Sequence, residues 1–375
     1  MKKTRILICG ILPPPYFGHS MMYKMLMGSS FIEEYDVSFL NLHFWTYQKH
    51  KKVTLTKIFK MLRYLWRYSI LIVSRRPKYV LYNMSFDKMP FLKDYIFCLL
   101  GRVLGCRIIL HDMGQYVKEL YDSSGFLHKR LIRHLLRITT ASIVLGEKTR
   151  FVYEGLFDVS RVVSVPGCVE DSRLAYPAQI QQKEDDQKIK VLYFSFLAPS
   201  KGLFTALEAI PKVIVKNPNI HFMFAGPFES EPVRQQMEIF LKEHQLKSHV
   251  TYLGYVGDDR QRTDCYRNAD IFIFPTLRDV FGLVILHAFA EGLPVIASVE
   301  GNIPEIVEEG RSGFLFSKGN AQSLAEKIVA LAEDEKLRSA MSQEALRKYH
   351  AVYTPRQYGQ RMTRAFQKIE GMEKK

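Results

Sequence analysis

Long apolar runs are missing from this sequence of 375 residues. No stretch of about 18 apolar residues occurs, so we expect no membrane-spanning helix. The apolar N-terminal stretch stops at Pro13-Pro14-Pro15 and has no small-residue cleavage site, which favours a buried first strand over a signal peptide.

Clustered cysteines are missing too. The five cysteines are far apart, at Cys9, Cys98, Cys106, Cys168 and Cys265. No Cys-x-x-Cys pair or Cys/His cluster is present, which argues against a zinc site and against a disulfide framework. We therefore expect reduced thiols, no metal site and a cytoplasmic protein.

Negative charge is scarce in the first half of the chain. Residues 1–180 contain 27 Lys or Arg against 13 Asp or Glu, a balance of +14, whereas residues 181–375 contain 26 against 25, a balance of +1. This asymmetry indicates that the first half meets something anionic. No nucleic-acid-binding motif accompanies the charge, so we expect no nucleic acid partner.

Two expected helices carry much of this positive charge. Residues 127–137 contain Lys129, Arg130, Arg133 and Arg137. Residues 55–73 place Lys57, Lys60, Arg63 and Arg67 on one face, and the other face holds Leu55, Ile58, Phe59, Leu62, Leu65, Trp66, Ile70 and Val73. Such a helix either lies on an anionic bilayer or covers a sheet as an outer helix. We expect both in part, with the apolar face packed inward and the charged rim near an anionic membrane.

Short apolar runs alternate with helix-length segments from end to end. Most of these runs are nearly continuous, which is typical of parallel strands covered on both faces. The sequence therefore predicts an α/β fold with two series of βα units. The expected strands are residues 4–10, 35–42, 79–85, 107–112, 142–147 and 161–165, then 190–196, 219–226, 249–255, 269–276, 294–298 and 313–317.

The length suits about two domains. Residues 174–188 are polar, contain Pro177 and separate the two βα series, so we predict a linker there. The predicted domains are residues 1–173 and 189–353. A last helix is expected within residues 354–375, where Thr354-Pro355 suits the N-cap and first helical positions.

Residues 270–298 form the most informative stretch. An apolar strand ends at Pro275, and a loop leads to a helix that begins at Phe281-Gly282 and runs to Gly292. In open parallel sheets, ligands bind at the carboxyl ends of the strands. A helix N-terminus there offers free backbone N–H groups and a positive dipole end, both of which suit a diphosphate. An ordinary strand-turn-helix without a ligand is the alternative.

This stretch, extended to Phe316, resembles the donor-binding half of the retaining glycosyltransferases of family four, within glycosyl transferases group 1. Further matching pieces are Pro13–Gly18, Val165–Val169, Ser195–Gly202, Phe224–Pro227, Gly301–Val307 and Gly310–Leu315, so the resemblance runs along almost the whole chain. It implies the GT-B fold, with two Rossmann-like domains facing each other across a cleft. The first domain would bind the acceptor, the second would bind the nucleotide-sugar, and the last helix would pack back on the first domain.

The resemblance also implies a set of donor-site residues in the second domain. Lys201 would neutralise the donor diphosphate and stabilise the leaving group. Asp279 would accept hydrogen bonds from sugar hydroxyls, and His287 would face the ribose. The backbone at Phe281, Gly282, Leu283 and Val284 would bind the diphosphate. A solvated surface lysine is the alternative for Lys201.

The chain departs from the family pattern at two positions. The family usually has a Glu-x7-Glu pair where this chain has Asp279 and His287, and an Arg where it has Phe196. Lys201 is therefore the one member of the usual cationic pair that the sequence keeps.

Two residues of the first domain complete the implied site. Gly18, in the turn of residues 13–18, would approach donor and acceptor, and His111, beside Asp112 at a strand end, would contact the transferred sugar. The alternatives are a rigid Pro-rich turn and a structural histidine.

The sequence thus predicts a hexosyltransferase-type glycosyltransferase that moves a sugar from a nucleotide-sugar to a hydroxyl with retention. No cofactor or obligatory metal is implied, and Asp185-Asp186 and Asp258-Asp259 lie in polar stretches rather than at strand ends. We expect a role in cell-surface polysaccharide or glycolipid assembly, with a lipid-linked saccharide acceptor and a place on the inner face of the cell membrane. A sugar-nucleotide epimerase and a non-catalytic GT-B scaffold are the alternatives.

Overall fold

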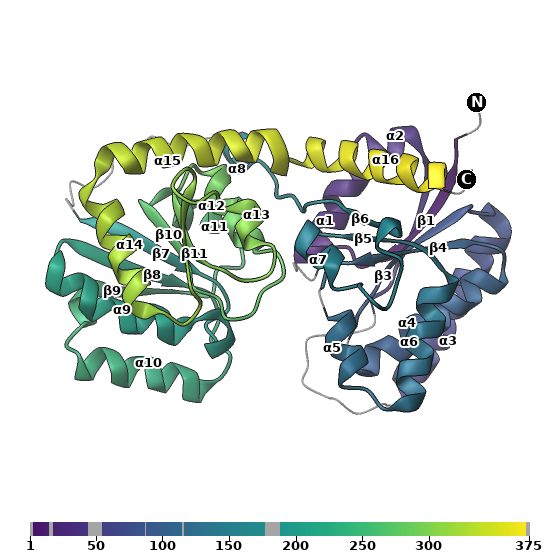
Figure 1. The fold of residues 1–375 in the computed structure, drawn as a ribbon, viewed down its shortest axis with the longest axis horizontal. Helices are drawn as coiled ribbons and strands as arrows, with labels where there is room; N and C mark the ends of the chain where they lie inside the picture. The colour runs from purple at the N-terminus through teal and green to yellow at the C-terminus, as the bar shows by residue number, and fades with distance from the viewer. Residues whose placement is uncertain are drawn as a thin grey trace. The chain divides into compact units, whose positions relative to one another are not determined.

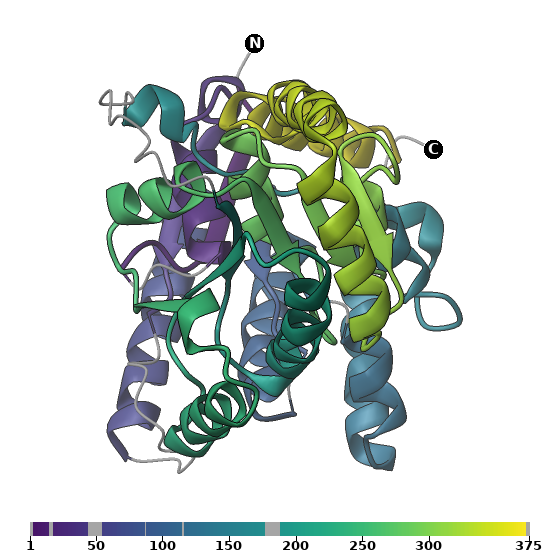
Figure 2. The same ribbon diagram turned by 90° about the vertical axis from the view of Figure 1, so that its left-hand side faces the viewer.

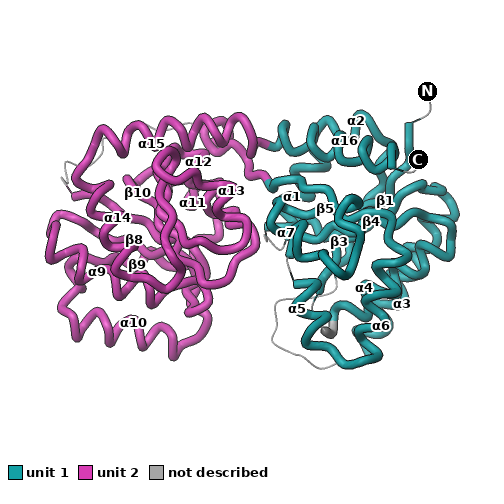
Figure 3. The backbone as a smooth tube through the Cα atoms, viewed as in Figure 1, with its two compact units in different colours: residues 1–167, 355–375 teal, residues 168–354 magenta. Residues whose placement is uncertain are grey.

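The computed structural model describes residues 3–14, 18–43, 55–86, 88–114, 116–176 and 188–372. The backbone divides into two compact units: unit 1 comprises Met1–Gly167 and Pro355–Lys375, and unit 2 comprises Cys168–Thr354 (Figure 3). Residues 177–187 of the predicted linker lie outside the described residues, as do residues 15–17 of the predicted N-terminal turn.

Unit 1 contains a parallel sheet of six strands in the order β2-β1-β3-β4-β5-β6 (Figure 1). The strands are β1 (Arg5–Gly10), β2 (Asp36–Asn41), β3 (Tyr79–Asn83), β4 (Arg107–Asp112), β5 (Thr139–Val144) and β6 (Val162–Ser164). The four residues from Ile6 to Cys9 are all buried. Both faces of the sheet are therefore covered, which explains the continuous apolar runs.

Strand β5 begins three residues before the predicted strand of residues 142–147. The preceding helix ends at Ile138, and the β-branched Thr139 and Thr140 enter the sheet without an intervening turn. Gly146 then directs the chain into the next helix, so the strand also ends earlier than predicted.

Helices cover both faces of the unit 1 sheet, with α3, α4 and α6 along one side and α2 and α16 along the other (Figure 1). The ring of Phe366 in α16 lies 5.3, 5.5 and 5.9 Å from the rings of Phe31, Tyr35 and Tyr79, between centroids. The last helix therefore packs against the first part of the chain within unit 1. The helices are α1 (Gly18–Met27), α2 (Phe31–Glu34), α3 (Leu55–Arg75), α4 (Lys88–Val103), α5 (Val117–Asp122), α6 (Phe126–Ile138), α7 (Glu147–Phe151), η1 (Val159–Arg161) and α16 (Pro355–Met372).

The expected inward packing of the apolar face of residues 55–73 is wrong. Helix α3 buries Tyr68 and Ile72 against the core of unit 1, with Tyr64, Leu65 and Leu71 partly buried beside them. The rest of the predicted apolar face is exposed: Leu55, Ile58, Phe59, Leu62, Trp66, Ile70 and Val73. Two apolar sets compete for the sheet on this helix, and the set containing two tyrosines occupies it.

Unit 2 contains a second parallel sheet of six strands, in the order β12-β11-β10-β7-β8-β9. Its strands are β7 (Ile189–Phe194), β8 (Ile220–Ala225), β9 (Val250–Gly254), β10 (Ile271–Phe274), β11 (Val295–Ser298) and β12 (Gly313–Phe316). The first strand of the unit, β7, pairs with both β8 and β10, so the strand order reverses between β7 and β10. Such a reversal is where open α/β sheets bind ligands, at the carboxyl ends of the strands.

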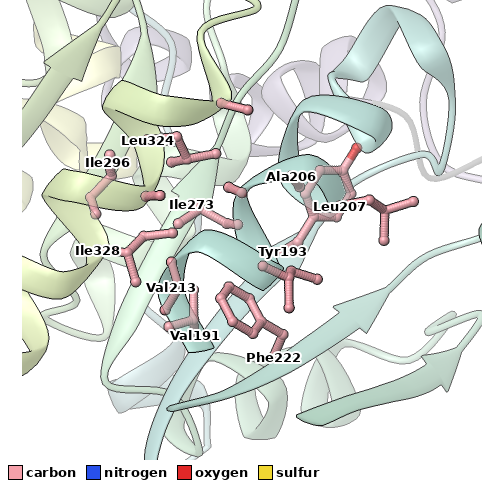
Figure 4. Close-up of a cluster of buried hydrophobic side chains, with 14 of the residues drawn as sticks. Val191, Tyr193, Ala206, Leu207, Val213, Phe222, Ile273, Ile296, Leu324 and Ile328 are labelled. Atoms are coloured by element: carbon pink, nitrogen blue, oxygen red, sulfur yellow. The ribbon is translucent and has the colours of Figure 1, made fainter. Parts of the chain in front are cut away.

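The core of unit 2 lies between this sheet and the helices α9 and α14, which run side by side (Figure 2). Val191, Tyr193, Phe222 and Ile273 of the strands meet Ala206, Leu207 and Val213 of α9 and Leu324 and Ile328 of α14 (Figure 4). The helices are α8 (Ser172–Ala175), η2 (Pro199–Lys201), α9 (Leu203–Lys216), α10 (Glu231–Glu243), η3 (Lys247–His249), α11 (Asp259–Arg267), α12 (Leu283–Ala290), α13 (Ile303–Ile306), α14 (Ala321–Glu333), α15 (Glu335–Lys348) and η4 (Tyr349–Tyr353).

Candidate active site

Two loops of unit 2 meet where the strand order reverses. One follows β7 and contains Lys201, and the other follows β10 and contains Asp279. The backbone N–H groups of Leu277 and Arg278 both donate to the carbonyl oxygen of Ser200, at 3.0 Å. These bonds tie the two loops together and fix the backbone on which both predicted side chains stand.

Gly202 lets the two loops approach each other this closely. It has a φ of +74°, and a Cβ there would overlap the carbonyl group of Pro275. Pro199 begins the short turn η2 with a fixed φ, and the hydroxyl of Tyr193 donates to the carbonyl oxygen of Lys201 at 3.0 Å. The position of Lys201 is therefore set by backbone constraints on both sides.

The structure brings Lys201 and Asp279 into direct contact. The Lys201 Nζ atom lies 2.6 Å from Asp279 Oδ2 and donates to the carbonyl oxygen of Arg278 at 3.1 Å. The two side chains are 26% and 18% exposed, so the pair is partly sheltered and still reachable by a ligand.

Asp279 also holds the loop that leads into α12 (Leu283–Ala290). Its Oδ1 atom accepts hydrogen bonds from the backbone N–H groups of Phe281, at 3.0 Å, and Gly282, at 2.8 Å. The carboxylate of Asp279 thus contacts the Lys201 cation and two of the backbone N–H groups that the sequence analysis assigned to a diphosphate. The same donors would suit phosphate oxygens equally well, because both ligands are oxyanions.

Helix α12 begins at Leu283, after Gly282 in the left-handed region with a φ of +75°. A Cβ on Gly282 would lie 3.1 Å from Ile285 Cδ1 and 3.2 Å from Phe274 Cε1, so a larger residue would crowd the helix start. Leu283 and Val284 stand in the first turn, where backbone N–H groups have no acceptor within the helix. Phe281 is buried and does not project as a ligand-binding side chain.

A third loop, not predicted from the sequence, supports the Asp279 loop. The backbone N–H and the side-chain amide of Asn302 both donate to the carbonyl oxygen of Val280, at 2.9 Å. Asn302 is fully buried, and Gly301 before it packs against the backbone of Asp279 and Val280. The resemblance included Gly301-Asn302, but only the structure shows that the amide anchors this loop.

His287 lies one turn further along α12. Its imidazole stacks on the ring of Tyr266, with 6.0 Å between centroids and 30° between planes. Burial, and to a smaller extent the charge of Arg262, hold the pKa of His287 well below its ordinary value. The side chain is therefore a neutral donor or acceptor and not a substitute for the negative charge of a glutamate.

Phe196 occupies the position where the resemblance expects an arginine. It is half-buried, and its carbonyl oxygen accepts from the Tyr193 hydroxyl at 3.4 Å. Its side chain brings no charge to the site, and Lys201 is the cation that this loop supplies.

The predicted residues of unit 1 stand at the carboxyl edge of its own sheet. His111 ends β4 and is fully buried, and Gly18 is the exposed first residue of α1. Burial lowers the pKa of His111 to about 3, with a smaller contribution from His19, so the imidazole is neutral. Within the described part of the chain, its Nε2 atom has no hydrogen-bond partner.

Tyr23 is a partner of His111 that the sequence did not reveal. Its hydroxyl lies 3.0 Å from His111 Nδ1. Burial raises the pKa of Tyr23 well above its ordinary value, so the hydroxyl keeps its proton and can donate it to Nδ1. In that arrangement the imidazole proton stays on Nε2, which becomes a buried, unpaired donor at the edge of the sheet.

Asp112 anchors the loop after β4. Its carboxyl group accepts hydrogen bonds from the Tyr153 hydroxyl, at 2.7 Å, and from the backbone N–H of Gly114, at 2.9 Å. Burial raises the pKa of Asp112 to about 7, while both hydrogen bonds act in the opposite direction. Its contacts are structural ones that hold the chain beside His111.

The described residues include no group of three or more His, Cys, Asp or Glu side chains that could hold a metal ion. Lys201, Asp279, Phe281, Gly282, Leu283 and Val284 are assembled at one edge of the unit 2 sheet, with His287 on the same helix.

Comparisons with known proteins show similarity to glycosyltransferases. Residues 177–348 match the family model described as glycosyl transferases group 1. A phosphatidyl-myo-inositol mannosyltransferase of Mycolicibacterium smegmatis is 25% identical over 192 residues, which are 51% of this chain and 48% of that protein. A capsular polysaccharide biosynthesis glycosyltransferase, CapM of Staphylococcus aureus, is 30% identical over 151 residues, which are 40% of this chain and 38% of that protein. The chain thus spans about half the length of the curated relatives it matches.

Solved structures extend the similarity to the fold of the whole chain. Anabaena Alr3699/HepE in complex with UDP has a TM-score of 0.72 at 15% identity, covering 97% of this chain and 100% of that one. A sucrose-phosphate synthase from Thermosynechococcus elongatus has a TM-score of 0.73 at 14% identity, covering 99% and 100%. The predicted α/β fold class is confirmed as GT-B, and residues 177–348 match the glycosyl transferases of group 1.

Proposed function

We propose that this protein is a retaining glycosyltransferase that moves a sugar from a nucleotide-sugar to a hydroxyl group of an acceptor. The observation that carries the proposal is the pairing of Lys201 with Asp279 at the N-terminus of α12, beside the strand-order reversal of unit 2. A cation and the backbone N–H groups of a helix N-terminus at such a place suit a diphosphate. Structures similar in fold were solved with UDP and with UDP-glucose, which supports a nucleoside diphosphate sugar as the donor.

The proposed chemistry places charge stabilisation on unit 2. When the bond between the anomeric carbon and the diphosphate oxygen breaks, negative charge grows on the diphosphate. Lys201 and the N–H groups of Gly282, Leu283 and Val284 would stabilise that charge. The acceptor oxygen bonds to the anomeric carbon and gives its proton to the leaving diphosphate oxygen, so the products are a glycoside and a nucleoside diphosphate.

We assign the sugar-recognition role to polar side chains near that centre. Asp279 would exchange its present contacts for sugar hydroxyls, and His287 would hydrogen-bond the ribose as a neutral imidazole. In unit 1, Gly18 would lie near the donor and acceptor, and the Nε2 atom of His111 would donate to an oxygen of the transferred sugar. No metal or cofactor takes part in this scheme.

We further propose that the acceptor is a lipid-linked saccharide and that the protein works on the inner face of the cell membrane, in polysaccharide or glycolipid assembly. The relatives named for phosphatidyl-myo-inositol mannosylation and capsular polysaccharide biosynthesis support this assignment. The excess of positive charge in residues 1–180 fits an anionic membrane as a partner.

A panel of sugar nucleotides, offered with and without lipid-linked acceptors, tests the proposal. A transferase releases nucleoside diphosphate and glycosylates the acceptor, whereas an epimerase changes the sugar nucleotide without an acceptor. A scaffold binds nucleotide without turnover. Binding is measured by thermal shift, since a ligand at 100 times its dissociation constant stabilises a fold by about 2.7 kcal/mol.

A further inference from the structure

Helix α3 carries an unusually apolar outer surface. Phe59 and Trp66 are 70% and 66% exposed, and five other large apolar side chains of the helix are exposed with them. We call these seven residues the α3 stripe: Leu55, Ile58, Phe59, Leu62, Trp66, Ile70 and Val73. Apart from the adjacent pair Ile58-Phe59, they are spaced by three or four residues, which keeps them on one side of the helix along its whole length.

The stripe faces away from unit 1 because the other side of the helix is anchored. Tyr68 and Ile72 are buried in the core against the sheet, and the hydroxyl of Ser69 donates to the carbonyl of Leu65 within the helix. Contiguous exposed apolar side chains of this size mark a surface that binds something, since isolated ones would need no explanation. No described residue covers the stripe.

The charges around the stripe identify the kind of partner. Helix α3 contains Lys57, Lys60, Arg63, Arg67 and Arg75 and no acidic residue. Arg63 and Arg67 directly follow Leu62 and Trp66 in the chain, so each stands about 100° around the helix from the stripe. The stripe is therefore bordered by guanidinium groups.

Helix α6 extends this surface. It contacts α4, which in turn contacts α3, so the three helices lie on one side of the unit 1 sheet (Figure 1). Phe126 and Leu127 at the start of α6 are 82% and 70% exposed. The helix carries Lys129, Arg130, Arg133 and Arg137 and no acidic residue. Apolar tips and basic flanks thus recur on the same side of unit 1.

We propose that the α3 stripe inserts into the interfacial layer of an anionic bilayer, with Lys60, Arg63 and Arg67 at the level of the lipid phosphates. An apolar stripe with a basic border suits that layer, where acyl chains lie next to negative headgroups. A second copy of α3 would set basic flank against basic flank, and a nucleic acid would leave the stripe in water. The inference rests on the proposed function in one respect, which is that a lipid-linked acceptor gives the enzyme a reason to dock.

The chain contains a natural reporter for this proposal. Its two tryptophans are Trp45 and Trp66, so Trp45→Phe leaves Trp66 of the stripe as the single tryptophan. In the full-length protein, Trp66 fluorescence should shift to shorter wavelength on vesicles of phosphatidylcholine with 30% phosphatidylglycerol, and much less on phosphatidylcholine alone. The shift is titrated against lipid concentration at low and high salt, because screening shortens from about 10 Å at 0.1 M to about 3 Å at 1 M.

Two variant pairs separate insertion from charge. Phe59→Ser with Leu62→Ser should weaken vesicle partitioning at least tenfold, whereas Val215→Ser with Ile239→Ser, equally exposed on unit 2, should leave it unchanged. Lys60, Arg63 and Arg67 changed to Gln should also weaken it about tenfold. The matched control for this charge change replaces Lys212, Lys216 and Lys242 of α9 and α10 with Gln, and it should leave vesicle partitioning unchanged.

Several results would overturn the proposal. Wild-type protein that ignores anionic vesicles, or that binds neutral ones equally, contradicts it. Unchanged partitioning of the Phe59/Leu62 variant removes the stripe from the contact. A large loss of thermal stability in that variant means that the chain itself covers the stripe, and concentration-dependent dimerisation abolished by it means that a second copy does. UDP binding without vesicles is measured on every variant, so a failure of docking is distinguished from a failure of the donor site.

Discussion

Asp279 occupies contacts that we propose for a donor diphosphate. Its removal is therefore expected to strengthen nucleotide binding and to weaken sugar transfer. The carboxylate holds Lys201 at 2.6 Å and accepts from the N–H groups of Phe281 and Gly282. A diphosphate at Lys201 would compete with this carboxylate for the same N–H donors. Lys201 and the two backbone N–H groups are thus paired with an anionic side chain of the same chain.

The magnitude follows from the bonds involved. A hydrogen bond to a charged group contributes about 1.5–3 kcal/mol, and part of that gain is lost when the released Lys201 side chain is hydrated. We expect Asp279→Ala to tighten UDP binding about tenfold, or about 1.4 kcal/mol. The same change removes the hydrogen bonds from Phe281 and Gly282 that hold the loop before α12, which costs about 1.5–3 kcal/mol of stability. Sugar transfer should fall, because the sugar hydroxyls lose an acceptor.

Isothermal titration with UDP, GDP and ADP measures the affinity, and thermal unfolding measures the stability. Asp334→Ala is the matched control, because Asp334 caps α15 by accepting from the N–H of Leu337 at 2.9 Å and has no role in the site. It should lower stability without changing the affinity for nucleotide. If Asp279→Ala leaves UDP affinity unchanged or weakens it, Asp279 does not compete with the diphosphate and the reasoning is refuted.

Three further predictions concern the surrounding residues. Gly282→Ala should destabilise the protein by about 1–2 kcal/mol through its left-handed backbone and weaken UDP binding. Gly310 has the same φ and open space around it, so Gly310→Ala should lower stability in denaturant unfolding without affecting UDP binding. Equal effects of the two changes on UDP binding would refute the close-approach argument. His287→Glu should bind UDP at least as tightly as wild type in titration, because Arg262 is near enough to compensate the new charge; lost binding would mean that a neutral imidazole is required. The pKa of His111 is about 3 in the folded protein and about 6.5 in the unfolded chain. Between these values the native state binds fewer protons than the unfolded state, so stability decreases as the pH is lowered. From pH 7 to pH 5 this loss is about 2 kcal/mol. The loss measured by urea unfolding should therefore be smaller by about this amount in His111→Gln than in wild type, since the other buried histidines contribute to both; identical pH slopes would mean that His111 titrates normally.

Burial of both sheet faces made the strands readable from sequence. Most of the parallel strands are nearly continuous apolar runs, and the predicted runs overlap all twelve strands of the described residues. The predicted strand ends were less accurate than the strand positions. The run at residues 269–276 became β10 (Ile271–Phe274), because Pro275 lacks the N–H that would continue the ladder.

The proposed donor-site residues were chosen for their place after strands and for the family resemblance, neither of which predicts their mutual contacts. No spacing rule indicates that Asp279, one methylene shorter than the usual glutamate, accepts from the backbone of its own loop and binds Lys201. The contact between Tyr23 and His111 joins positions 88 residues apart, and it depends on the sheet order of unit 1.

The orientation of α3 shows a limit of amphipathic patterns. The pattern correctly grouped its apolar side chains on one face and its basic ones on another, and the helix itself was predicted. It could not decide which apolar set meets the sheet, because Tyr68 and Ile72 compete with the stripe and periodicity alone does not rank them.

Lys201 provides the most direct test of the central claim that unit 2 stabilises a leaving diphosphate. Initial rates of nucleoside diphosphate release, with the donor and lipid-linked acceptor that the wild type uses, are compared for wild type, Lys201→Ala and Lys212→Ala. Lys212 is an exposed lysine on α9, the helix that follows Lys201. Loss of the cation should cost about 2–4 kcal/mol of transition-state stabilisation, so Lys201→Ala should turn over about 30- to 1,000-fold more slowly while Lys212→Ala matches wild type. Wild-type turnover in Lys201→Ala would contradict the account.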